Sequence, residues 1–131
     1  MSDVQTRLET FLAAHGAVAG TVHMLDGEVL VLAAHHRIPD TVVAVTRTIP
    51  HGKGMAGLAW ARGVPVQTCD LRDDPTGDVR PGARAVDAGA AVAIPVGQPL
   101  RGVVGAAFAE TGDLPRDRIR ALAVAAEDVL G

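Results

Sequence analysis

Residues 49–75 read IPHGKGMAGLAWARGVPVQTCDLRDDP, which combines turn, helix and strand signals in close succession. Its glycines at 52, 54 and 57 allow the backbone to turn sharply into a short helix over GMAGLAWARG, and the apolar run PVQTC that follows predicts a strand. The glycines either leave free N–H groups for an anion at the helix start or serve only close packing of the helix on a sheet. The stretch is not a phosphate-binding P-loop, because Met55 follows GKG where that motif needs Ser or Thr.

On both sides of residues 49–75, short apolar runs predict further strands. Upstream, AVAGTVHMLD and EVLVLAAHH are joined at Asp26-Gly27, a dipeptide favoured in tight hairpin turns, so residues 17–35 are predicted to form a hairpin. The segment TVVAVTRTIP resembles a short helix. Downstream, AAVAIPV and RGVVGAAFAE read as buried strands joined by GQPLRG, after a polar loop over residues 70–88.

Both ends of the chain predict amphipathic helices. Ser2 and Gln5 have the spacing of a capping box, and apolar residues then recur at helical spacing as far as Gly16. Near the other end, Pro115 suits the first turn of a helix whose apolar stripe continues to Gly131. The order of elements predicts an α+β fold, in which helices cover both faces of an antiparallel sheet.

Composition excludes several classes of function. The net charge is -3, and Lys53 is the only lysine among 12 basic residues, which are scattered, so we expect no nucleic-acid partner. The single cysteine, Cys69, excludes an internal disulfide and a Cys-based zinc site, and the adjacent His35 and His36 point to opposite faces of a strand, so no metal site is expected. Without a signal peptide or a long apolar run, we expect a cytoplasmic protein with no membrane contact, and the Ala-, Gly- and Arg-rich composition suggests a bacterial source.

The spacing within residues 49–75 resembles the central signature of GAF domains: a Gly-rich turn, a short helix, Gly-x-Pro-Val, an Asp and a later Asp-Pro. The upstream hairpin, the pair AVAIPV and RGVVGAAFAE, and the two terminal helices extend the resemblance over residues 1–131, which are expected to form a single GAF-like domain. The resemblance implies a central antiparallel sheet of about five to six strands. It also implies that the terminal helices cover one face and that short helices and loops cover a small-molecule pocket on the other.

Carried onto this sequence, the implied pocket lies among the helix after Gly54, the segment after Cys69 and the exposed face of the central strands. The candidate ligand-binding residues are Trp60, Cys69, Asp70, Arg80, Arg84, Val92, Ile94 and His23. No catalytic residue is proposed.

Each of these candidates also has a purely structural interpretation. Arg80 and Arg84 lie four residues apart, so on a helix they would form a clamp for a carboxylate or phosphate, or they pair with nearby aspartates. Cys69 would be reactive only if its pKa were lowered, and a lone cysteine is more often a small inert residue. Trp60 either belongs to the core or lines the pocket as its one large aromatic side chain.

Several known GAF activities do not suit the residues present. Free methionine sulfoxide reductases depend on cysteines, where alignment with this chain places Ala56 and Arg84. Cyclic-nucleotide-binding members carry a signature with Asn, which is absent from the sequence, and bilin-binding members use a Cys-His pair where Cys69 is followed by Asp70. Haem would need an axial histidine, for which His23 is the only strand candidate. We therefore expect no bound cofactor.

The sequence thus predicts a non-enzymatic GAF domain that senses a small molecule or anion in signal transduction. The chain contains no kinase, cyclase or DNA-binding segment, so the signal is expected to pass to a separate partner, such as a kinase or regulator, or to the remainder of a longer protein. The terminal helices are short and Ala-rich, which suits a homodimer built as a four-helix bundle. Two alternatives stay open: an enzyme similar to the free methionine sulfoxide reductases, and a dimerisation or adaptor module without a ligand.

Overall fold

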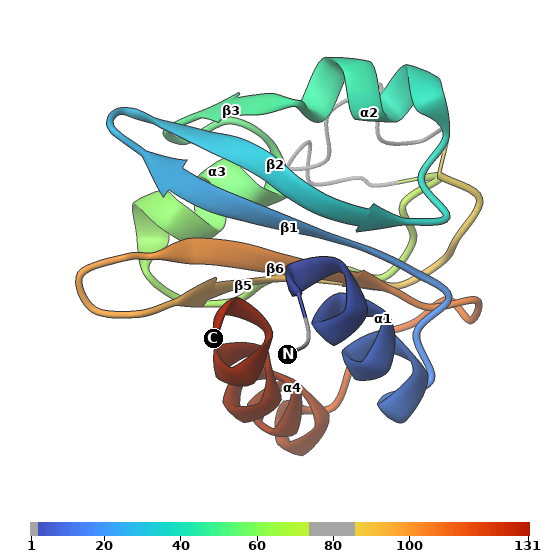
Figure 1. The fold of residues 1–131 in the computed structure, drawn as a ribbon. Coiled ribbons are helices and arrows are strands. Elements are labelled where there is room, and N and C mark those ends of the chain that lie inside the picture. Colours follow the sequence, from blue (N-terminus) through green and yellow to red (C-terminus); the bar gives the residue numbers. More distant parts are fainter. Residues whose placement is uncertain (1–2, 74–85) are drawn as a thin grey trace.

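The computed structural model describes residues 3–73 and 86–131. In this part of the chain, six strands form one antiparallel sheet and four helices flank it (Figure 1). The elements in chain order are α1 (Val4–Ala14), β1 (Ala19–Asp26), β2 (Val29–His36), α2 (Asp40–Thr46), β3 (Thr48–Pro50), α3 (Gly54–Arg62), β4 (Val66–Thr68), β5 (Ala91–Val96), β6 (Gly102–Ala107) and α4 (Arg116–Leu130). The predicted α+β class with an antiparallel sheet is confirmed.

The sheet has the strand order β3-β2-β1-β6-β5-β4, so β1 and β6 lie at its centre. The hairpin predicted at Asp26-Gly27 joins β1 and β2, and Gly27 has a φ of 63°, a conformation that side-chain-bearing residues rarely adopt. One prediction was too coarse: TVVAVTRTIP was expected to be a short helix, but Thr48–Pro50 at its end form the edge strand β3, paired with Val29–Val31 of β2. Three residues are too short a stretch for periodicity to separate strand from helix.

The N-terminal helix begins one residue later than the predicted capping box implies. Asp3 is the N-cap of α1, and its side-chain oxygen accepts a hydrogen bond of 2.8 Å from the backbone N–H of Thr6. This hydrogen bond lowers the pKa of the Asp3 carboxyl group below its ordinary value. Ser2, the predicted cap, lies outside the described residues.

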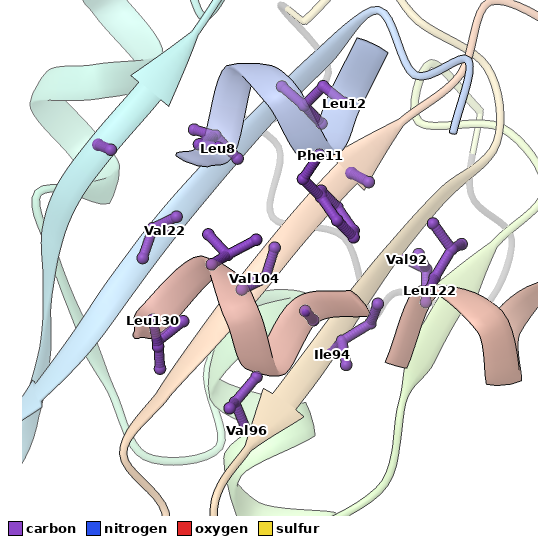
Figure 2. Close-up of a cluster of buried hydrophobic side chains, with 14 of the residues drawn as sticks. Leu8, Phe11, Leu12, Val22, Val92, Ile94, Val96, Val104, Leu122 and Leu130 are labelled. Carbon is purple, nitrogen blue, oxygen red and sulfur yellow. The ribbon is translucent and has the colours of Figure 1, made fainter. Parts of the chain in front are cut away.

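The two terminal helices cover one face of the sheet (Figure 1) and form the main core with it. Figure 2 shows Val92, Ile94 and Val96 of β5 pointing toward this helical layer, as Val22 and Val104 of the neighbouring strands do. The remaining large side chains of this core are supplied mainly by the helices, including Leu8, Phe11, Leu12, Leu122 and Leu130. Large apolar residues therefore point to the helix-covered face at alternate positions of the central strands.

The opposite face of the sheet is covered by α2 and α3 and by the segments that follow β2 and β4 (Figure 1). Helix α3 approaches the sheet edge closely because Gly57 has no side chain: a Cβ there would lie 2.6 Å from the carbonyl oxygen of Pro50. Gly63, with a φ of 69°, ends this helix in the left-handed conformation. The close-packing interpretation of the glycine-rich stretch therefore applies to Gly57.

Candidate ligand-binding site

The face of the sheet under α2 and α3 carries mostly small side chains. Because side chains alternate along a strand, the residues between the large ones of β1, β6 and β5 all point to this face. The strand register arranges them in three adjacent rows, which run Ala19–Ala107–Ala91, Thr21–Gly105–Ala93 and His23–Val103–Pro95. The first two rows offer nothing larger than a threonine, so this face of the sheet is hollow at its centre.

A cavity of about 130 Å³ lies over these rows. Its walls on the far side come from α2, β3 and the start of α3, and from single residues of the flanking segments: Ile38, Val42, Thr46, Ile49, Gly54, Met55, Ala56, Leu71 and Val86. An engineered cavity of about 150 Å³ with apolar walls can hold a benzene molecule, so the space suits a small organic ligand. The described walls are almost entirely apolar.

His23 is the most deeply buried polar side chain of the cavity wall, with an exposed fraction of 2%. It lies on β1 where the pairing with β2 shifts register, between Val22 and His23, and such irregularities commonly redirect side chains beside functional sites. Its Nε2 atom is 2.8 Å from the backbone carbonyl oxygen of Thr46 at the end of α2. A carbonyl oxygen can only accept, so Nε2 carries the proton and Nδ1 is a bare acceptor.

The Nδ1 atom of His23 is buried and has no hydrogen-bond partner among the described residues. Burial lowers the pKa of His23 below its ordinary value of 6.5, while the hydrogen bond to Thr46 opposes this shift. The imidazole is therefore neutral at pH 7. Leaving a buried acceptor unpaired costs about 1–3 kcal/mol.

Two further polar features border the cavity. The Thr21 hydroxyl group lies beside Gly105 on the cavity floor, since its Oγ1 atom is 2.7 Å from the place where a Cβ on Gly105 would be. The first turn of α3 also reaches the cavity through Gly54, Met55 and Ala56. The side chain of Lys53, the N-cap of this helix, makes no capping hydrogen bond. The free N–H groups of such a first turn attract hydrogen-bond acceptors.

Of the six predicted site residues that the structure describes, two line this cavity, His23 and Val92. The expectation that Ile94 faces the pocket needs correction, because its side chain belongs to the core under α1 and α4. The side chain of Val92 belongs to the same core, although the residue also contributes to the cavity floor. The strand AVAIPV is buried on both faces, so hydrophobicity alone did not show which alternate set faces the pocket.

The remaining described candidates lie outside the cavity wall. Trp60 of α3 is partly buried against the core cluster under this helix, and its ring meets His51 edge to face with centroids 4.8 Å apart. Cys69 is exposed. The carboxylate of Asp70 accepts hydrogen bonds from Arg72, which lower the pKa of Asp70. These contacts favour structural roles for Trp60 and Asp70.

Arg80 and Arg84, the predicted clamp for an anionic ligand, lie outside the described residues. In the parts of the chain that are described, no three His, Cys, Asp or Glu side chains come close enough to hold a metal ion. The same parts hold no helix long and apolar enough to cross a membrane.

Sequence reasoning missed the small residues that make the cavity. Ala91, Ala93, Gly105 and Ala107 shape its floor, and none was a candidate. The signal was present in the sequence AVAIPV, where small and large residues alternate with the strand period from Ala91 to Ile94. The large set marks the packed face, and the small set marks the face with room for a ligand.

A six-stranded antiparallel sheet with two terminal helices on one face and a covered cavity on the other defines a class of small α+β domains. A family model described as "GAF domain" matches residues 4–129, and the chain belongs to that family. No curated protein sequence matches the chain. GAF domains commonly bind small molecules and occur in multidomain proteins.

Several solved structures share the fold at low sequence identity. The GAF domain of a phosphoenolpyruvate-protein phosphotransferase from Coxiella burnetii superposes with a TM-score of 0.76 and 19% identity, over 99% of this chain and 82% of that one. The second GAF domain of DevS from Mycobacterium smegmatis gives 0.68 and 17%, covering 96% and 86%. A free methionine-R-sulfoxide reductase from Neisseria meningitidis, solved with its substrate, gives 0.71 and 21%, covering 96% and 74%. At these identities the likeness shows the fold alone.

Proposed function

We propose that this GAF domain is a small-molecule sensor, which binds its ligand in the cavity between the sheet and helices α2 and α3. One observation carries the proposal: in the two rows Ala19–Ala107–Ala91 and Thr21–Gly105–Ala93, no side chain on the cavity face is larger than threonine, so the hollow is built into three adjacent strands. A well-packed domain fills its interior closely, so a hollow maintained by several strands together favours a binding role.

A thermal-shift screen with amino acids, nucleotides, short carboxylates and small uncharged metabolites tests this proposal, because a ligand that binds only the folded state raises the melting temperature. Ala107→Leu adds a large side chain to the cavity floor. Ala109→Leu is the matched control, since it makes the same change at an exposed position just beyond the same strand. We expect a hit whose shift survives in the control and is lost in Ala107→Leu. A shift that survives equally in both variants would place the ligand elsewhere.

We further propose that the signal leaves through α1 and α4, on the face opposite the cavity, toward a second copy of the chain and a separate regulator. Both helices pack on the central strands whose other side forms the cavity floor, so a ligand can influence them through one layer of the sheet. Sedimentation equilibrium at micromolar concentration checks the dimer, and a monomer at all concentrations would refute it.

Reduction of free methionine sulfoxide is the second candidate, because several of the structurally similar proteins are free methionine-R-sulfoxide reductases. That chemistry would have to use Cys69, the one thiol of the chain, which is exposed and does not line the cavity. We expect no turnover when the protein is incubated with free methionine-R-sulfoxide and a thiol reductant. Turnover that disappears in Cys69→Ser would replace the sensor proposal with an enzyme.

A further inference from the structure

We infer that the ligand of this cavity is a compact, uncharged molecule that donates an N–H or O–H hydrogen bond to His23 and accepts one at a carbonyl-type oxygen from the first turn of α3. The inference rests on the proposal that the cavity holds a ligand, and it adds the chemical class. Three features of the described wall support it: the hydrogen-bonding state of His23, the start of α3 and the charge of the wall.

His23 is committed to one hydrogen-bonding state before a ligand arrives. The Thr46 carbonyl oxygen, 2.8 Å from Nε2, keeps the proton on that nitrogen and leaves Nδ1 as a lone-pair acceptor. Nδ1 is buried without a partner in the described structure, and the side chain as a whole is 2% exposed. A small adjustment of the ring toward a ligand N–H or O–H group would satisfy this atom. A ligand oxygen without hydrogen would face it lone pair to lone pair.

The start of α3 has the complementary preference. The backbone N–H groups of Met55 and Ala56 belong to the first turn of a nine-residue helix, and neither has an acceptor within the described chain. The first intrahelical bond runs from Gly57 N–H to the Lys53 carbonyl oxygen, so these two groups stay available beside the cavity. A ligand oxygen is the natural acceptor for them, and the positive end of the helix dipole strengthens that contact.

The charge of the wall and the volume of the cavity further restrict the chemical class of the ligand. Among the described residues that line the cavity, none is Asp, Glu, Lys or Arg, and the only titratable side chain is that of His23. An ion placed there would lose its hydration without gaining a charged partner from the described wall, which is costly in an apolar site. The volume of about 130 Å³ suits a molecule close to the size of benzene. A small cyclic amide meets all of these conditions together, since one amide group supplies the donor, the acceptor and no charge.

Three probes of nearly equal size test the class: δ-valerolactam has an N–H donor and a carbonyl oxygen, cyclohexanone keeps the carbonyl oxygen without the donor, and benzoate is an anion. Each is titrated into the full chain at pH 7.5, with the backbone amide and imidazole ¹⁵N resonances as the readout. We expect the lactam to bind about tenfold more tightly than cyclohexanone, since one buried acceptor is paired only by the lactam. The His23 Nδ1 resonance should move with the lactam, and benzoate should not bind in the cavity.

His23→Phe keeps the ring volume and carries no hydrogen-bond acceptor, whereas a glutamine would still offer its amide oxygen to the ligand. The matched control is His35→Phe, at an exposed position of β2 that does not line the cavity. In His23→Phe we expect the lactam to bind no better than cyclohexanone, whereas His35→Phe keeps the tenfold preference. A His23→Leu variant, which also lacks an acceptor, serves as a second variant if the phenylalanine variant does not fold.

The outcomes separate this inference from the function on which it rests. If cyclohexanone or benzoate binds as tightly as the lactam and Ala107→Leu abolishes that binding, the cavity is a ligand site but its assigned class is wrong. If none of the three probes shifts a cavity resonance, the class is also wrong, and the sensor proposal is then decided by the metabolite screen with Ala107→Leu and Ala109→Leu.

Discussion

The hollow face of the sheet can be tested by adding one methyl group to each face and comparing the cost. Gly105 and Gly20 are glycines of adjacent central strands whose missing side chains point to opposite faces. A Cβ on Gly105 would lie 2.7 Å from the Thr21 hydroxyl oxygen, with no other neighbour closer than 4.0 Å. A Cβ on Gly20 would lie 2.7 Å from both the Gly105 carbonyl oxygen and a methyl carbon of Leu12.

These neighbours set different magnitudes. In Gly105→Ala the Thr21 side chain can rotate away into the cavity, and alanine is favoured over glycine in a strand by about 0.5–1 kcal/mol, so the free energy of unfolding should stay unchanged or rise by up to about 1 kcal/mol. In Gly20→Ala the backbone carbonyl cannot move without disturbing the β1–β6 pairing, and overpacking of this kind costs about 1–3 kcal/mol.

Thermal unfolding followed by circular dichroism or calorimetry measures both changes. At about 3–5 °C per kcal/mol for a chain of this size, Gly20→Ala should lower the melting temperature by roughly 3–15 °C, while Gly105→Ala should leave it within a few degrees or raise it. Equal losses in the two variants would show that the face of Gly105 is packed as tightly as the helix-covered face, and the cavity account would then be wrong.

Four further changes have expected outcomes. As the pH falls below 6.5, His23 takes up a proton in the unfolded state but resists protonation in the folded state. The melting temperature should therefore fall more steeply between pH 7 and pH 5 in the wild type than in His23→Gln. Parallel curves of melting temperature against pH would contradict a buried neutral imidazole. Leu122→Ala, at a side chain of α4 with no exposed area, should cost about 2–5 kcal/mol by urea denaturation, and a cost under about 1 kcal/mol would refute the helix-side core. Asp3→Ala should cost about 1 kcal/mol, because it removes the cap of α1, with Asp3→Asn nearly neutral as the control. Cys69→Ser should change the unfolding free energy by less than about 0.5 kcal/mol, and a larger loss would mean that the exposed thiol makes an important contact.

Much of the fold could be predicted because its signals are local. The dipeptide Asp26-Gly27 fixes the β1–β2 turn, and Gly63 ends α3. The helical spacing around Leu8 and Leu122 marks the apolar face of each terminal helix, and both of these faces pack on the same side of the sheet. Together with the resemblance of residues 49–75 to the GAF signature, these signals were enough for the class and the family. The edge strand β3 was missed because its three residues take their conformation from pairing with β2, a contact distant in sequence.

The site was harder to predict, because a cavity consists of positions where side chains are small. Trp60 and Cys69 were predicted to bind the ligand because of their side-chain chemistry, yet the structure places them outside the cavity wall. His23 could be predicted as a site residue because it is the one histidine in the mostly apolar strand β1. Its hydrogen bond with Thr46 depends on the packing of α2 over β1, which no local pattern encodes.

Alanine methyl resonances offer the most direct test of the central claim, that this domain binds a small molecule between the sheet and helices α2 and α3. With ¹³C-labelled alanine methyl groups, Ala91, Ala93 and Ala107 report on the cavity floor, while Ala34 and Ala126 report on the core under the terminal helices. The account predicts that a ligand found by thermal shift moves the three floor resonances strongly and the two core resonances little. Shifts confined to Ala34 and Ala126, or to neither set, would contradict it.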